Sequence, residues 1–226
     1  MKVLLFGATG MVGMGVLREC LLDPRVERVV AIGRASTGLI HAKLGEIVLP
    51  DLSDLSSIEG ELTGFDACFF CLGVSAAGMS EADYRRITKD LTLSVAKTVL
   101  RLCPEITFIY VSGASTDSTE KGRAMWARVK GETENALLAM PFKAKYMFRP
   151  GIIRPLHGIR SKTKVYRIAY AVLTPLYPIL KLVAPQLLTN TEAVGRAMIA
   201  VAANGTDKLH LENDDINRLA ALPQAA

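Results

Sequence analysis

The sequence predicts an α/β fold, a doubly wound parallel sheet with a small C-terminal elaboration on the substrate side. Three observations lead to this prediction. Apolar strand-like runs alternate with helix-length segments, a glycine-rich stretch follows the first run directly, and the pattern changes after Arg149-Pro150-Gly151. Strands that alternate with helices form parallel sheets covered on both faces, because right-handed crossovers return each helix onto the sheet.

The first part of the chain contains the expected strands and helices in regular order. Short apolar runs bounded by turn residues are typical of buried strands. Six strands are expected, at Lys2–Phe6, Arg28–Ile32, Glu46–Leu49, Ala67–Leu72, Thr107–Ser112 and Lys145–Arg149. Helices are expected between them, at Met11–Leu22, Glu81–Leu102 and Glu120–Ala139.

The C-terminal part is expected to be an addition to this core and not a second domain. It contains a helix over Thr191–Ala203, capped by Asn190 or Thr191, then a short strand over Lys208–Leu211 and a last helix over Asp214–Leu222. We therefore expect one domain of residues 1–226. Residues 1–155 form its core, and residues 156–226 form an elaboration over the carboxyl edge of the sheet.

The apolar segment 162–185 is interrupted by prolines, and its uncharged stretch is too short for a bilayer, which needs roughly 20 apolar residues. It can line an apolar pocket, pack on the sheet or on a partner subunit, or contact a membrane peripherally through its flanking basic residues. The residues on which these alternatives depend are Met147, Ile152, Ile153, Tyr166, Tyr170 and Tyr177 for the pocket and Lys162, Lys164, Arg167 and Lys181 for the membrane. The basic helix 84–97 is either a solvated face or the surface of a homodimer.

Composition and charge narrow the class of protein. Half of the residues are hydrophobic and 22% are charged, which is typical of a folded chain. The net charge of +5 favours small anionic ligands. The Lys and Arg residues are scattered, without the dense patches typical of nucleic-acid binding, so no nucleic acid is expected as a partner.

The four cysteines predict no metal centre. Cys68 and Cys71 lie in one apolar strand at a spacing of three, which places their thiols on opposite faces of the sheet. A zinc site would need further ligands. Free thiols fit a reducing compartment, and the apolar run Val3–Phe6 is too short for a signal peptide. We therefore expect a cytoplasmic protein.

The glycine-rich stretch predicts a dinucleotide-binding loop and makes the fold one of the Rossmann type. The first glycine allows a tight turn, the second a close approach to a pyrophosphate, and the third the packing of helix on strand. The start of the helix offers unpaired N–H groups to the phosphates. The loop consists of Gly7, Ala8, Thr9, Gly10, Met11, Val12 and Gly13.

The ends of the next strands predict which dinucleotide binds. Arg34 stands where NAD-binding proteins usually have an acidic residue, so NADP is favoured over NAD. Asp51 can accept a hydrogen bond from the adenine, with Leu52 against the ring, or it can cap the short helix that follows. Leu72 and Gly73 end the fourth strand, where glycine permits close approach of the cofactor.

Several motifs together resemble one family. They are GATGMVG (Gly7–Gly13), IGR (Ile32–Arg34), CLG (Cys71–Gly73), YVSGAS (Tyr110–Ser115), KGETE (Lys130–Glu134) and FRPGIIRP (Phe148–Pro155). In these the chain resembles the atypical short-chain dehydrogenase/reductases, and most closely the epimerase-like, Tat-interacting-protein-like NAD(P)-binding oxidoreductases. The resemblance implies hydride transfer to a small carbonyl substrate, helped by a Ser–Tyr–Lys set.

The catalytic set implied by the resemblance is incomplete. Lys130 matches the lysine, and Ser112 the serine, with Ser115 as a second candidate. Pro150 and Gly151 match the segment beside the nicotinamide. The tyrosine position holds Trp126, whose indole N–H donates a hydrogen bond but transfers no proton near neutral pH.

Two alternatives about these residues stay open. Tyr84 or Tyr110 can replace the missing acid, whereas Tyr177, four residues before Lys181, lies in the wrong region. Lys130 either binds the nicotinamide ribose or forms a surface pair with Glu134. The sequence therefore predicts a weak or atypical NADP-dependent oxidoreductase, or else a non-catalytic NADP-binding sensor or interaction module.

Overall fold

The computed structural model describes residues 1–159 and 183–222. Its centre is a seven-stranded parallel sheet in the order β3-β2-β1-β4-β5-β6-β9. The strands are β1 (Lys2–Phe6), β2 (Arg28–Gly33), β3 (Leu44–Val48), β4 (Ala67–Phe70), β5 (Thr107–Val111), β6 (Ala144–Arg149) and β9 (His210–Glu212). The predicted doubly wound α/β fold is confirmed.

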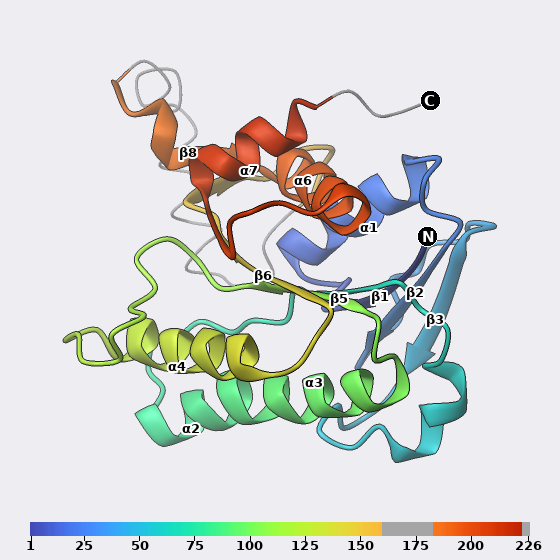
Figure 1. Cartoon of the computed structure of the whole chain (residues 1–226), viewed down its shortest axis with the longest axis horizontal. Coiled ribbons are helices and arrows are strands. Elements are labelled where there is room, and N and C mark those ends of the chain that lie inside the picture. The colour runs from blue at the N-terminus through green and yellow to red at the C-terminus, as the bar shows by residue number, and fades with distance from the viewer. Residues whose placement is uncertain (160–182, 223–226) are drawn as a thin grey trace.

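Helices cover both faces of the sheet (Figure 1). One face carries α1 (Met11–Leu22), α6 (Thr191–Asn204) and α7 (Asn213–Ala220). The other carries the 3₁₀ helix η1 (Ser56–Glu61), α3 (Leu91–Leu102) and α4 (Met125–Ala139), with α2 (Glu81–Arg85) beside α4. Each sheet face is a separate hydrophobic core, which explains why the buried strands are apolar on both sides. Cys68 belongs to one core and Cys71 packs against the other, as their spacing predicts.

Two predicted helices differ in detail from the structure. The helix expected at Glu81–Leu102 is interrupted by a π-helical turn at Arg86–Asp90. The helix expected from Glu120 begins at Met125, because Asp117 accepts backbone hydrogen bonds from Thr119 and Gly122 and holds the preceding residues in a turn. Local side-chain acceptors of this kind compete with helix formation.

The C-terminal part contributes more to the fold than an elaboration over the carboxyl edge. β9 pairs with β6 inside the sheet, and α6 packs on α1. The two helices approach closely, since a Cβ built on Gly15 would lie 2.5 Å from the Thr191 Cβ. Asn190 caps α6 by accepting from the Ala193 N–H at 2.8 Å. Residues 160–182, which include the four basic residues predicted for membrane contact and the three pocket tyrosines, lie outside the described residues.

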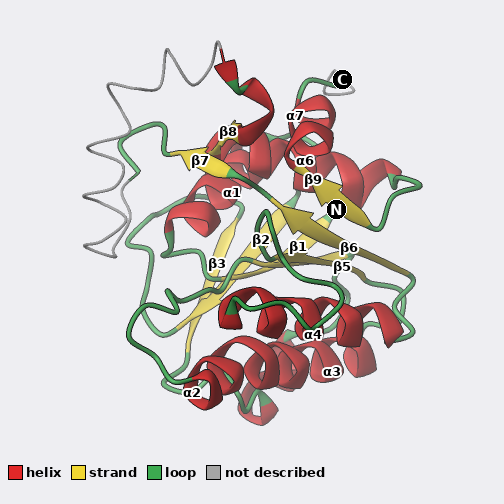
Figure 2. Ribbon diagram, turned by 90° about the vertical axis from the view of Figure 1, so that its left-hand side faces the viewer, coloured by secondary structure: helices red, strands yellow, loops and turns green. Residues whose placement is uncertain are grey.

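A two-stranded parallel ribbon was not predicted. β7 (Ile152–Arg154) pairs with β8 (Leu188–Asn190), and Figure 2 shows this ribbon beside α6 and α7, above the main sheet. A Cβ on Gly151 would lie 2.4 Å from the Leu187 carbonyl oxygen, so glycine is needed where the two segments meet. In the described parts of the chain, no helix has the length and apolar character to cross a membrane.

Candidate cofactor site

A cavity of about 1080 Å³ lies at the carboxyl ends of the parallel strands. The strand order reverses direction between β1 and β4, which is where open α/β sheets form their ligand crevice. The cavity brings together most of the predicted site. The predicted residues that line it are Gly7, Ala8, Thr9, Gly10, Met11, Val12, Arg34, Leu52, Leu72, Gly73, Ser112, Lys130, Pro150 and Gly151.

The glycine loop has the close contacts that were predicted for it. Gly7 has a φ of +88°, and a Cβ there would lie 2.7 Å from the carbonyl carbon of Cys71 at the end of β4. Gly13 does not line the cavity. A Cβ on Gly13 would lie 2.1 Å from the Gly7 carbonyl oxygen, so Gly13 supports the loop from behind by letting α1 pack directly on it.

The start of α1 is suited to a phosphate group. Gly10 precedes the helix and has no side chain to accept from its first N–H groups, and the first turn contains no acidic residue. The Gly10 N–H itself donates to the Gly7 carbonyl at 2.9 Å and closes the turn. The partial positive charge of the helix end is therefore directed into the cavity without a competing carboxylate.

Arg34 lies at the mouth of the cavity, immediately after β2. In residues 1–159 and 183–222 its guanidinium has no hydrogen bond or ion pair. The loop that follows is fixed by Glu46 of β3, which accepts from the Ser36 hydroxyl at 2.6 Å and the Thr37 N–H at 2.7 Å. Glu46 was not among the predicted site residues, although an acidic residue on an edge strand beside a polar loop is a signal for such a contact.

The adenine role predicted for Asp51 is not supported by its position. Asp51 is exposed and lies outside the cavity. Its Oδ1 accepts from both the N–H and the hydroxyl of Ser53 at 2.8 Å. These hydrogen bonds, the backbone one first, lower the pKa of Asp51. The next helix starts at Ser56 after Leu55, so Asp51 does not cap it either, whereas the buried Leu52 does line the cavity.

Ser112 lines the cavity, but its hydroxyl forms hydrogen bonds within the protein. The Ser112 Oγ lies 2.5 Å from Oε1 of Glu134 and 3.1 Å from the Phe148 carbonyl oxygen. Both atoms accept, so they compete for the single hydroxyl proton. Ser115, the second candidate, is exposed and lies outside the cavity lining.

Glu134 is the centre of a buried ionic cluster that the sequence analysis did not find. Its side chain has no exposed surface and pairs with Arg149, whose Nε lies 3.1 Å from Oε1. Arg149 also pairs with the exposed Glu212 of β9 at 3.2 Å. The Nε2 of His210 lies 3.6 Å from Glu134. Because Glu134 pairs with Arg149, the surface pair between Lys130 and Glu134 is not formed.

Lys130 extends from α4 to the end of β5 inside the cavity. Its ammonium donates to the Ser112 carbonyl oxygen. Desolvation by the surrounding protein lowers the pKa of Lys130 to about 8, and the nearby charge of Glu134 opposes this shift. Lys130 is thus held beside Gly113 and Pro150, at the end of the cavity opposite Arg34.

Two of the aromatic residues considered for the site line the cavity. Trp126 and Tyr84 are both in its wall. Tyr84 is 2% exposed and comes from α2. Tyr110 is fully buried in the core beneath α3 and α4, and burial raises the pKa of its hydroxyl above the usual range. Tyr84, not Tyr110, is therefore the tyrosine within reach of a ligand.

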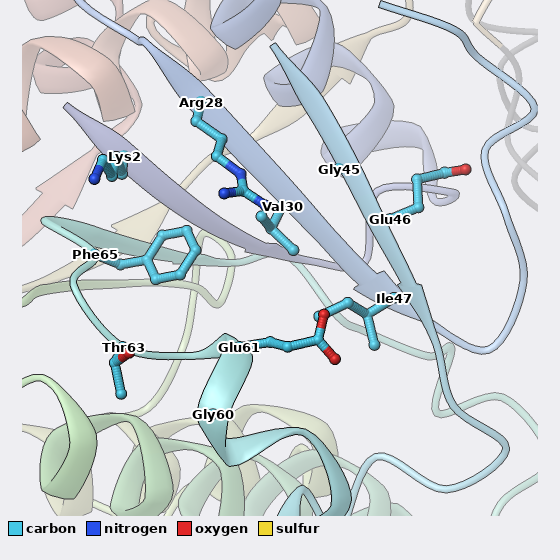
Figure 3. A pocket seen from close by; sticks show the side chains of 10 residues that line it. All are labelled: Lys2, Arg28, Val30, Gly45, Glu46, Ile47, Gly60, Glu61, Thr63 and Phe65. Atoms are coloured by element: carbon cyan, nitrogen blue, oxygen red, sulfur yellow. The ribbon is translucent and has the colours of Figure 1, made fainter. Parts of the chain in front are cut away.

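A second hollow of about 360 Å³ lies at the opposite, N-terminal end of the strands. Figure 3 shows Lys2 and Arg28 beside it at the starts of β1 and β2, with Glu61 extending toward Ile47 and Glu46 pointing away. It is separate from the cavity of the glycine loop and includes none of the predicted site residues.

Comparison with known proteins identifies relatives of this chain. The protein fmp52, mitochondrial, of Emericella nidulans is 34% identical over 159 residues, which cover 67% of this chain and 66% of that protein. The protein fmp52-1, mitochondrial, of Aspergillus terreus is 34% identical over 170 residues, 72% of this chain and 70% of that protein. The chain belongs to the FMP52 family. No family profile matches the chain.

Solved structures agree with the fold of this FMP52 family member. WbmF of Bordetella bronchiseptica in complex with NAD⁺ has a TM-score of 0.67 and 15% identity, and the match covers 97% of this chain and 76% of WbmF. The short-chain dehydrogenase/reductase YIR035C of Saccharomyces cerevisiae has a TM-score of 0.64 and 14% identity over 97% of this chain and 98% of YIR035C. These similarities confirm the short-chain dehydrogenase/reductase type of fold.

The prediction of a cytoplasmic protein is wrong, because the FMP52 relatives are named as mitochondrial proteins. That prediction rested on the expectation of free thiols and on the interpretation of the first apolar run as a strand. Free thiols distinguish reducing from oxidising compartments but not the cytoplasm from a mitochondrion.

In the described residues there is no group of three or more His, Cys, Asp or Glu that could hold a metal ion.

Proposed function

We propose that the protein is an NADP-dependent oxidoreductase of the atypical, epimerase-like short-chain dehydrogenase/reductase type that acts on a small carbonyl substrate. The observation that carries the proposal is one cavity lined by the glycine loop, Arg34 and Lys130 at the switch point of the sheet. The narrower grouping with Tat-interacting-protein-like oxidoreductases is part of this proposal.

The residues present fit a nicotinamide dinucleotide along the length of the cavity. The glycine loop and the start of α1 would hold the pyrophosphate, and Arg34 would hold a 2′-phosphate through paired, charge-assisted hydrogen bonds. Lys130 would bind the nicotinamide ribose, with Pro150 and Gly151 beside the ring. When bound, this cofactor supplies or accepts the hydride.

The Arg34→Ala substitution tests the choice of cofactor. Charge-assisted hydrogen bonds contribute about 1.5–3 kcal/mol each, so NADPH affinity is expected to fall roughly 10- to 100-fold while NADH affinity stays unchanged. Quenching of Trp126, the only tryptophan of the chain, measures both affinities directly. Arg28→Ala is a matched control, because Arg28 is exposed at the opposite end of β2. Equal loss of NADPH and NADH affinity would argue against a 2′-phosphate at Arg34.

Turnover tests the oxidoreductase assignment. We expect NADPH oxidation, followed by its absorbance, with some members of a panel of aldehydes, ketones and quinones. The rate is expected to be lower than that of an enzyme with the usual tyrosine, because general acid catalysis contributes roughly 10²–10⁴ in rate when the acid is well placed. If no substrate is reduced by the protein or by Trp126→Tyr, the catalytic assignment fails.

A non-catalytic NADP sensor is the second candidate. Two observations favour it. Trp126 stands at the position where the resembled family has its acidic tyrosine, and the Ser112 hydroxyl forms a hydrogen bond to Glu134. This function predicts tight NADP binding without turnover and a protein partner whose affinity changes with NADP. A pull-down with and without NADP distinguishes the two, since a partner unaffected by NADP contradicts the sensor.

A further inference from the structure

The proposed reductase needs a proton donor that its sequence motif does not supply. Addition of hydride to a carbonyl carbon leaves the electron pair of the C=O bond on oxygen, and this oxygen must take a proton. Trp126 cannot provide it, because an indole N–H donates a hydrogen bond but does not ionise near neutral pH. The donor must therefore be another group in the cavity wall.

In the described residues, few groups in the cavity wall around Lys130 could donate a proton. The Ser112 proton is shared between Glu134 and the Phe148 carbonyl. The Cys71 thiol lies in the wall, but burial raises its pKa above the usual range and makes it a poor acid. The other hydroxyls of the described wall are aliphatic alcohols, which are weaker acids than a phenol or an ammonium, so Tyr84 and Lys130 are left as donors.

The position of Lys130 favours it over Tyr84. One of its three N–H groups donates to the Ser112 carbonyl, which fixes the ammonium at the end of β5 and leaves two for a ligand. A Cβ built on Gly113 would lie 3.8 Å from the Lys130 Nζ, so the ammonium lies directly beside the backbone of Gly113. Lys130 thus faces the cavity at the carboxyl ends of the parallel strands.

We propose that Lys130 itself protonates the substrate oxygen during carbonyl reduction, in addition to holding the cofactor ribose. This step rests on the proposed oxidoreductase function. Hydride adds to the carbonyl carbon, the carbonyl π pair moves to oxygen, and that oxygen takes a proton from the Lys130 ammonium. The carbonyl is reduced to an alcohol, NADPH is oxidised to NADP⁺, and the neutral lysine is reprotonated from solvent.

The surroundings of Lys130 suit an acid that works near neutral pH. Burial lowers its pKa to about 8, and the carboxylate of Glu134, one turn along α4, opposes the shift. Tyr84 of α2 shares the cavity wall with Lys130, while Tyr110 of β5 and Arg149 of β6 interact with Glu134. Because the ammonium is the acid, it is present below a pH of about 8 and lost above it. The rate of reduction is therefore expected to fall as the pH rises through 8.

The test compares two substrates at saturating NADPH in single-turnover measurements. Reduction of an aromatic aldehyde by hydride at carbon produces a strongly basic alkoxide that needs an acid, whereas a quinone that accepts hydride at oxygen leaves a much less basic phenolate that does not. Lys130→Arg keeps a positive charge for the ribose but releases no proton. Tyr84→Phe tests the competing donor, and Lys97→Met, an exposed lysine of α3, is the control.

We expect Lys130→Arg to lower the aldehyde rate by about 10²–10⁴, to affect the quinone rate much less, and to remove the fall in rate near pH 8. An equal loss with both substrates would overturn the assignment, because it indicates a role in binding alone. So would a Tyr84→Phe variant that loses the pH dependence. Unchanged reduction by Lys130→Arg overturns the donor assignment alone, whereas no NADPH oxidation by the unmodified protein overturns the proposed function itself.

Discussion

Replacement of Glu134 by glutamine is expected to lower the free energy of unfolding by about 3 kcal/mol, a value typical of a buried ion pair that loses one partner. Glu134 has no exposed surface, and the side chain of Arg149 is only 12% exposed. The substitution leaves the Arg149 guanidinium without its buried counter-charge and also removes a charged acceptor from Ser112. Urea unfolding followed by circular dichroism measures the change.

Glu212→Gln is the matched control, because Glu212 pairs with the same arginine but is 54% exposed. Exposed ion pairs contribute about 0–1 kcal/mol, so a small change is expected. Similar losses of unfolding free energy in the two variants would contradict the view that burial makes the Glu134–Arg149 pair more important for stability than the exposed Glu212–Arg149 pair.

Replacement of Gly13 by alanine is expected to disrupt the cofactor loop. The new Cβ would lie 2.1 Å from the carbonyl oxygen and 2.6 Å from the carbonyl carbon of Gly7, both backbone atoms that cannot rotate away. Insertion of atoms into a packed region typically costs about 1–3 kcal/mol, and the loop must shift for α1 to stay in place. We expect NADPH affinity to fall more than tenfold, since about 1.4 kcal/mol corresponds to a factor of ten.

The control for this change is Gly60→Ala, since a Cβ on Gly60 meets no atom within 4 Å. Titration of Trp126 fluorescence with NADPH and thermal unfolding of both variants make the comparison. If Gly13→Ala binds NADPH as the unmodified protein does, the loop is not held by α1 as the structure indicates.

The sheet and the glycine loop could be predicted because they depend on local sequence. Apolar runs mark the strands, and the spacing of Gly7, Gly10 and Gly13 marks the loop. The start of α4 could not be placed in this way, because Asp117 sets it through hydrogen bonds to Thr119 and Gly122 that compete with the helix. The ribbon of β7 and β8 joins segments 36 residues apart and has no signature in either segment alone.

The polar contacts of the site were the least predictable part. A glutamate four residues after a lysine is typical of a surface pair, yet Glu134 is buried against Arg149 of β6. That contact depends on how α4 packs on the sheet, which the sequence of the helix does not specify. For the same reason the direction of the Ser112 hydroxyl could not be foreseen, although the position of Ser112 at the strand end could.

The late position of β9 and α6 in the chain has a consequence for synthesis. Until residue 212 has left the ribosome, β6 has an unpaired edge, and α1 lacks the helix that packs on it. An open strand edge is a template for pairing with other chains. Interrupted translation products are therefore expected to aggregate, because the edge of β6 stays open until β9 pairs with it.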